Sequence, residues 1–387
     1  MTIFFPPQQR LIDLEVARIS IPGSAGIPVE LPMAGKQGRI YRSHKMPRTL
    51  FKIYEPHMVY PEMERTINLI KQVCLDIPNI CQIISPIFDK AAGNCIGFAM
   101  PEITNATYLK DAKLNTAQDR IKACQQLASA CFALQLRGAG PADLHDQNIL
   151  VEKTGWLWII DVDSFFILER TFDGVQIEHH PQLGTLEFSA YELLGNHAEI
   201  RHSHETAAYS LAVILYQILK GHHPAQLRNT VGRILPASDI ISRGFYGRFS
   251  EDRKGLEIID AGIPWADIPG NLRHLFERAF GAGLEDPTKR PLAQQWHEAI
   301  DEWVRGQVRP VGVTRKRHLV ASFLMGMAVT ELVPKVYPLI AETKTPEPPA
   351  PQVSVEDVRA RIEEATKKIE ELKKKGAASW LAEKPKP

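Results

Sequence analysis

The segment that most constrains this chain is DLHDQNILVEKTGWLWIID at residues 143–161, in which a polar loop leads into two short apolar runs. The runs are Ile149–Val151 and Trp156–Ile160, and Lys153–Gly155 between them is a turn sequence. Short apolar runs bounded by turn residues are typical of strands. We therefore expect two strands joined by a tight turn, with polar side chains at their outer ends.

Three of these polar side chains form a candidate site. Asn148 precedes the first strand and Asp161 follows the second, so the hairpin should bring their side chains together. Amide and carboxylate oxygens suit a Mg²⁺ ion that bridges phosphates. Asp143, five residues before Asn148, would then face a nucleophilic hydroxyl and orient it or accept its proton. The structural alternative is that the three residues serve only as caps and turns.

The first part of the chain is predicted to be rich in strands. An arm at residues 1–28 leads into it, and short apolar runs separated by turn sequences extend from Val29 to Tyr54. Pro61 then opens a helix, and two further strand-like runs end near residue 104. The apolar residues that recur at helical spacing in that helix are Met63, Ile67, Ile70 and Cys74.

The second part is predicted to be mainly helical. The segments with helical periodicity are Thr116–Leu136, Glu205–Leu219, Asn271–Phe280 and Ala293–Val304. A strand-rich part followed by a helical part indicates an α+β class, with two lobes and the hairpin at the cleft between them.

Taken in order, these residues resemble the motifs of protein kinases, over roughly residues 29–305. Asp143 and Asn148 match the catalytic aspartate and the metal-binding asparagine of the family's H-R-D-L-x-x-x-N loop. Asp161 matches the aspartate of D-F-G, and Lys52 in LFKIY resembles the V-A-I-K lysine. The D-L-H-x-x-N form of the loop resembles that of bacterial Ser/Thr protein kinases.

The resemblance implies a nucleotide site. Gly35 and Gly38 in MAGKQGRIY match the second and third glycines of the family's G-x-G-x-x-G-x-V loop, and Ile40 matches its valine. Met100 would lie at the back of the adenine pocket, followed by the hinge whose backbone meets the base. The residues implied for nucleotide binding are Gly35, Gly38, Ile40, Lys52, Met100, Glu102, Ile103 and Asn148.

The same resemblance implies that Lys52 holds the α and β phosphates and pairs with a glutamate of the first helix. A helical wheel does not separate Glu62 from Glu64. We expect Glu64, because Pro61 makes Glu62 a first-turn residue that could simply stabilise the helix dipole.

The fold and activity implied are those of a bilobal kinase, with an N-lobe at 29–104 and a C-lobe at 105–308. The segment 164–189 would be the activation segment, in which Thr185 positions the loop or the substrate. Arg290 would pair with Glu192 of the A-P-E counterpart Ala-Tyr-Glu. The implied reaction is ATP-dependent transfer to Ser/Thr hydroxyls of a protein substrate or of the chain itself. The implied catalytic residues are Asp143, Lys52 and Glu64, and the implied Mg²⁺ ligands are Asn148 and Asp161.

Several positions depart from the family pattern. Pro141 and Ala142 replace the His and Arg before the catalytic aspartate, and Ala207 stands where an Asp often anchors the loop. Asp163 replaces the glycine of D-F-G, and its carboxylate would serve either as a second metal contact or only as an exposed charge. His145, where Ser/Thr kinases carry a lysine, also occurs in kinases of small molecules. The alternatives are therefore a small-molecule kinase and a non-catalytic nucleotide-binding scaffold.

Composition excludes other classes. With 44% hydrophobic and 24% charged residues the chain can bury a core, which excludes global disorder, and a net charge of +1 predicts no nucleic-acid partner. Five cysteines without a CxxC pair suit reduced thiols. Since the N-terminus has no signal-peptide pattern, we expect a cytoplasmic protein.

The last part of the chain differs in character. Residues 309–341 include the apolar stretch 319–333, which we expect to dock on protein, with membrane contact as the less favoured alternative. A proline-rich linker at 342–352 precedes 353–387, an amphipathic helix and tail. The face at 353–376 would pack on the body or associate with a partner or a second copy.

Overall fold

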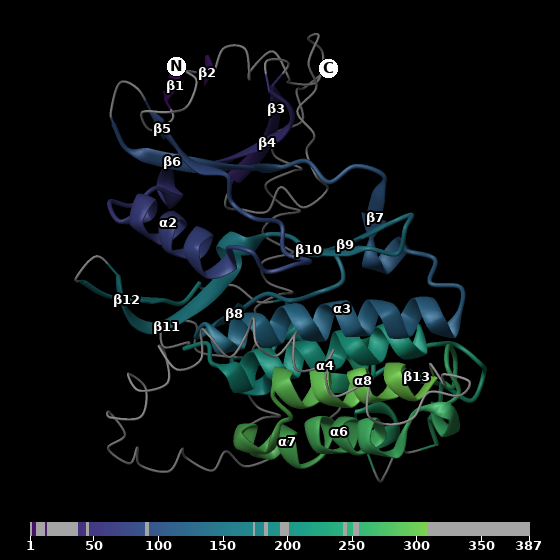
Figure 1. Ribbon diagram of the computed structural model, residues 1–387. Coiled ribbons are helices and arrows are strands. Elements are labelled where there is room, and N and C mark those ends of the chain that lie inside the picture. The colour runs from purple at the N-terminus through teal and green to yellow at the C-terminus, as the bar shows by residue number, and fades with distance from the viewer. Residues whose placement is uncertain are drawn as a thin grey trace, which may run out of the picture.

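The computed structural model describes residues 2–4, 12–13, 38–43, 46–89, 93–172, 175–181, 185–193, 201–242, 246–250 and 255–307. Within these residues the chain is mixed α and β (Figure 1), which confirms the expected class. Gly35 and the predictions made for 309–341, 342–352 and 353–387 lie outside the described residues. No helix in the described ranges combines the length and the apolar character that a membrane crossing requires.

A six-stranded sheet forms one end of the molecule, with strand order β2-β1-β5-β6-β4-β3 (Figure 1). Two short strands of the N-terminal arm join its edge, where β1 pairs antiparallel with β5. The strands are β1 (Thr2–Phe4), β2 (Ile12–Asp13), β3 (Gly38–Ser43), β4 (Met46–Tyr54), β5 (Ser85–Asp89) and β6 (Cys95–Pro101).

Alternation along β4 decides which way Lys52 points. Successive side chains of a strand face opposite sides of the sheet. Phe51 is buried in a small apolar cluster with Ile87, Ile96 and Ala99. Lys52 therefore points to the other face, which carries the main core, including Phe98 and the helix α2 (Met63–Cys74).

Helix α2 packs on that same face, below the sheet in Figure 1. The predicted apolar stripe is the buried one, because Met63, Ile67, Ile70 and Cys74 are each at most 3% exposed. Glu62 and Glu64 lie on the solvent side of the first turn, and both are exposed. The orientation of α2 is thus fixed by its apolar residues.

Four helices at the other end of the molecule agree with the four predicted segments, whereas two short helices, α5 (Ala237–Ser242) and α7 (Ala282–Glu285), were not predicted. Helix α3 starts with a capping box between Thr116 and Asp119, and α4 with one between Ser203 and Thr206. Helix α4 ends at Gly221, whose φ of 74° gives the left-handed C-cap. The helices are α3 (Ala117–Leu136), α4 (His204–Lys220), α5 (Ala237–Ser242), α6 (Gly270–Phe280), α7 (Ala282–Glu285) and α8 (Ala293–Gln307).

Short strands lie between the large sheet and the helices (Figure 1). The predicted hairpin is confirmed as β9–β10, in which Ile149 pairs with Ile159, and β7 extends it. A second hairpin, β11–β12, was not predicted, because residues 164–189 had been assigned as one activation segment. These strands are β7 (Ala106–Tyr108), β8 (Ala139–Pro141), β9 (Ile149–Glu152), β10 (Leu157–Ile159), β11 (Phe165–Phe172) and β12 (Val175–His179). The strands β13 (Leu227–Arg228) and β14 (Glu257–Ile258) pair in a separate sheet, and β13 lies among the helices in Figure 1.

All five cysteines are buried and free. Burial raises the pKa of their thiols, for example that of Cys95 to about 11. They are therefore inert packing residues of the core rather than reactive thiols.

Candidate functional site

The site is centred on the ammonium group of Lys52. It lies 2.6 Å from Asp161 Oδ1 and 2.7 Å from Asp163 Oδ2. Its side chain is 9% exposed, that of Asp163 is 5% exposed and that of Asp161 is 29% exposed. Lys52 comes from β4 in the large sheet, whereas both carboxylates come from the turn after β10. The contact therefore joins the two parts of the chain.

Burial and charge act in opposite directions on these groups. Burial by itself lowers the pKa of Lys52, but the two carboxylates outweigh it and hold that pKa above its ordinary value. Burial by itself would raise the pKa of both aspartates. At Asp161 the nearby Lys52 outweighs burial and the pKa is lowered, whereas at Asp163 burial prevails and the pKa is raised.

Asp163 has a second donor. The hydroxyl of Tyr54 donates to Asp163 Oδ2 at 2.8 Å. Tyr54 follows Lys52 by two positions on β4 and so shares its side of the sheet. Asp163 is therefore neither an exposed charge nor a residue that only contacts a metal: it is a buried acceptor for two donors of one strand.

The backbone at Asp161 is in the left-handed region, with φ 60° and ψ 43°. The 3₁₀ turn Val162–Ser164 follows it, and both the amide and the hydroxyl of Ser164 donate to the Asp161 carbonyl oxygen, at 3.0 and 2.7 Å. A non-glycine residue in this region is uncommon, and such residues cluster at functional sites. The turn directs the carboxylates of Asp161 and Asp163 to the same ammonium group.

Asn148 lies at the open end of the β9–β10 hairpin, as predicted. The backbone amide of Ile160 donates to the Asn148 carbonyl oxygen at 2.9 Å. Asp161, the next residue after Ile160, therefore lies beside Asn148. The side-chain Nδ2 of Asn148 donates to the Asp143 carbonyl oxygen at 3.0 Å. That bond uses the nitrogen of the amide and leaves its oxygen as the atom to accept a cation or a donor.

Asp143 is held by the segment that contains Thr185. The Thr185 amide and hydroxyl both donate to Asp143 Oδ1, at 2.9 and 3.0 Å. Asp143 Oδ2 lies 3.7 Å from Nε2 of His145, a side chain that is 1% exposed. The Gln147 amide donates to His145 Nδ1, which places the ring proton on Nε2. Thr185 thus occupies one oxygen of Asp143, and the other oxygen faces the imidazole.

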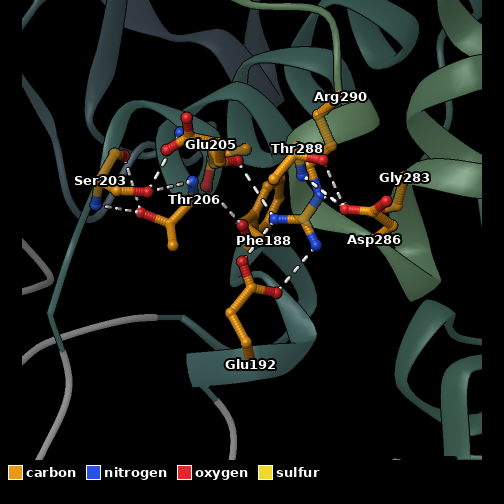
Figure 2. A network of polar contacts seen from close by, with 10 residues as sticks. Phe188, Glu192, Ser203, Glu205, Thr206, Gly283, Asp286, Thr288 and Arg290 are labelled. Atoms are coloured by element: carbon orange, nitrogen blue, oxygen red, sulfur yellow. Dashed lines mark hydrogen bonds and ion pairs between the residues drawn. The ribbon is translucent and has the colours of Figure 1, made fainter. Parts of the chain in front are cut away.

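A buried ion pair stabilises the helical part next to this segment (Figure 2). The Arg290 guanidinium donates to both oxygens of Glu192, at 2.5 and 2.8 Å, which confirms the predicted pair. It also donates to the carbonyl oxygens of Gly283 and Glu205, so one side chain ties the 3₁₀ turn Tyr191–Leu193 to α7 and to the start of α4.

The expected partner of Lys52 is wrong. Glu64 and Glu62 are exposed on the first turn of α2, and neither contacts Lys52 among the described contacts. The physical reason is that Met63 and Thr66 occupy the buried side of that turn, which leaves the glutamates in water. Asp163 takes the position next to the ammonium group.

The remaining predicted residues lie in β3 and β6 or directly after β6. Gly38 begins β3, where a Cβ atom would lie 2.5 Å from the Ile53 carbonyl oxygen of β4, so only glycine fits. Ile40 is half-buried and pairs with Lys52 across the two strands. Met100 ends the buried part of β6 at 8% exposure. The Glu102 amide bonds to the β4 carbonyl of Arg48, and Ile103 packs on the main core.

No protein-family model matches the chain, and no curated protein is significantly similar to it. Three contacts of the site were not predicted from the sequence: that of Asp163 with Lys52, that of Tyr54 with Asp163, and the bonds from Thr185 to Asp143. A usable signal existed for Tyr54, because it lies two positions from Lys52 in a strand.

The oxygen donors fit a Mg²⁺ ion better than a metal held wholly by protein. The described residues contain no group of three or more His, Cys, Asp or Glu side chains arranged to hold a metal. Mg²⁺ commonly takes one or two carboxylates and fills the rest of its shell with water and phosphate oxygens. Asp161 and the amide oxygen of Asn148 are the atoms that would supply such a partial shell.

Proposed function

We propose that this chain is an ATP- and Mg²⁺-dependent protein kinase of the bilobal kinase fold that phosphorylates Ser/Thr hydroxyls. The observation that carries the proposal is that four residues from three segments lie together. Lys52 contacts Asp161 at 2.6 Å, and the hairpin places Asn148 beside Asp161. The amide of Asn148 in turn bonds to the backbone of Asp143 at 3.0 Å.

The chemistry assigned to each residue follows from its atoms. Lys52 is a fixed positive charge that would hold the phosphates, and Asn148 and Asp161 would hold Mg²⁺, which supplies charge stabilisation to the transferred group. Asp143 Oδ1 is occupied by Thr185, so Oδ2 is the oxygen that would accept the proton of the attacking hydroxyl. Positioning and electrostatics carry most of the rate in such transfers.

The segment that bears Thr185 favours a protein substrate over a small metabolite. It is anchored to Asp143 at one end and, through Glu192 and Arg290, to the helices at the other. A surface fixed in this way next to the acceptor site suits an extended peptide. We likewise propose that the protein is cytoplasmic, which its five buried free thiols support, that it binds no nucleic acid, and that 353–376 mediates association.

The test is incubation of the purified full-length chain with γ-labelled ATP and Mg²⁺, followed by mapping of phosphorylated residues. We expect label on Ser or Thr in the wild type and a loss of about 10²-fold or more in Asp143→Asn, in line with the worth of a positioned base. The matched control is Asp111→Asn, the same change at an exposed aspartate.

Undiminished transfer in Asp143→Asn would overturn the proposal. Nucleotide binding without any transfer would point to the scaffold alternative. Transfer to a small hydroxyl compound but to no protein would point to a small-molecule kinase.

A further inference from the structure

The glutamate that was expected to hold Lys52 is not in contact with it, although the lysine is almost fully buried. A buried ammonium group needs a fixed counterion, and the position of that counterion determines where the ammonium group lies. The residues that do surround Lys52 therefore decide how the nucleotide site is organised. They are Asp161 and Asp163, both from the turn after β10.

The two carboxylates differ in their surroundings. Asp161 is 29% exposed at its side chain and adjoins Asn148, whereas Asp163 is 5% exposed. Both oxygens of Asp163 lie within hydrogen-bond distance of Lys52, at 2.8 and 2.7 Å, and one of them also accepts from Tyr54 at 2.8 Å. Asp161 is therefore the carboxylate with room for another partner, and Asp163 is the one whose acceptor positions are filled by protein.

Helix α2 offers no alternative counterion in this packing. Rotating it to bring Glu64 toward Lys52 would withdraw Met63 and Ile67, which are 3% and 2% exposed, from the main core. The apolar stripe and the first-turn glutamates are on different sides of the helix. The carboxylates that hold the Lys52 ammonium group consequently come from the turn after β10 and not from α2.

We propose that Asp163 is the positioning residue for Lys52, in the role that a glutamate of α2 was expected to fill. This inference rests on the proposed function and names how its nucleotide site is held. With two carboxylates on one ammonium group, Asp161 serves as an oxygen donor for the cation while Asp163 keeps the lysine in place. Tyr54 orients Asp163, and α2 need not move for Lys52 to be in position to bind the phosphates.

The first half of the test needs no nucleotide. The unfolding equilibrium is measured for Lys52→Met, Asp163→Asn and the double variant, beside Lys52→Met, Glu64→Gln and their double variant. Close charge pairs couple strongly. We therefore expect the change in the unfolding equilibrium constant caused by Asp163→Asn to be smaller by a factor of about ten or more in the Lys52→Met background than in the wild type. Glu64→Gln should act equally in both backgrounds. Additive effects at Asp163, or coupling at Glu64, would overturn the inference.

The second half measures the affinity for a fluorescent ATP analogue with Mg²⁺ at a temperature where every variant is folded. Asp163→Asn should weaken binding about tenfold, Asp163→Glu should recover part of the loss, and Glu64→Gln should bind within about twofold of the wild type. Should Asp163→Asn be poorly folded, Tyr54→Phe, which removes one bond to Asp163, should show a smaller loss in the same direction.

The two failures are distinguishable. If the wild type binds the analogue and Asp163→Asn binds it equally well, Asp163 has no positioning role and the proposed function stands. If the wild type does not bind the analogue at all, the proposed function falls and the positioning role falls with it, even where the stability cycle detects the pair.

Discussion

Replacing Glu192 by glutamine should lower the free energy of unfolding by about 3 kcal/mol. The change leaves the shape of the side chain intact and removes the negative charge that faces Arg290. The Arg290 side chain is 0% exposed, and Glu192 accepts two of its donors, at 2.5 and 2.8 Å. In the variant, the NH₂ group of the glutamine side chain would face one of the two N–H donors of Arg290, so that donor would lose its acceptor.

The magnitude follows from the burial of the pair. Removing one partner of a buried ion pair costs roughly 3–5 kcal/mol, because the other charge stays in the interior. Glu192 is 27% exposed, so water can partly replace its charge and the lower end of that range applies. The carbonyl oxygens of Gly283 and Glu205 still accept from Arg290, which limits the loss further.

The assay is urea unfolding followed by tryptophan fluorescence, since Trp296 is buried in the core at 0% exposure. The matched control is Glu55→Gln, which removes the charge opposite Arg39 in a pair that is 59% and 35% exposed. An exposed pair is worth at most about 1 kcal/mol. Equal costs for the two variants, at an unchanged dependence on urea, would refute the reasoning from burial.

Two further changes have defined outcomes. Burial lowers the pKa of His223 to about 4, while both ring nitrogens are bonded to backbone, at Glu187 and Ala225. The unfolded chain therefore binds more protons than the folded chain between about pH 6.5 and 4. The free energy of unfolding should fall by about 3 kcal/mol as the pH is lowered through that window. In urea unfolding, the free energy of His223→Gln should depend less steeply on pH, and the same pH dependence as in the wild type would contradict this. Thr116→Ala removes the N-cap acceptor of α3 and should cost about 1 kcal/mol in the same assay, against no change for an exposed mid-helix substitution such as Lys122→Ala.

The elements that depend on local sequence were predictable. The β9–β10 hairpin and the position of Asn148 beside Asp161 follow from two apolar runs and a turn, all within a short stretch. The buried stripe of α2 follows from helical spacing alone. The Arg290–Glu192 pair was implied by family resemblance rather than by spacing, and the structure contains it.

The counterion of Lys52 was not predictable in the same way. A buried charge takes whichever opposite charge the tertiary packing brings nearest, and spacing along α2 does not encode that distance. Asp163 was read as a metal contact or an exposed charge because its burial depends on β4 lying over the turn. The β11–β12 hairpin was missed although Asp173-Gly174 between its strands is a strong hairpin signal in the sequence.

The left-handed backbone at Asp161 limits which inactive variants are informative. Only glycine, asparagine and aspartate readily adopt a φ of 60°, the value at Asp161. An alanine there would add backbone strain to the loss of the carboxylate. Any phenotype of such a variant in cells would mix misfolding with inactivity. Asp161→Asn keeps the backbone preference and the side-chain shape, and is therefore the substitution from which a lost function can be attributed to the missing charge.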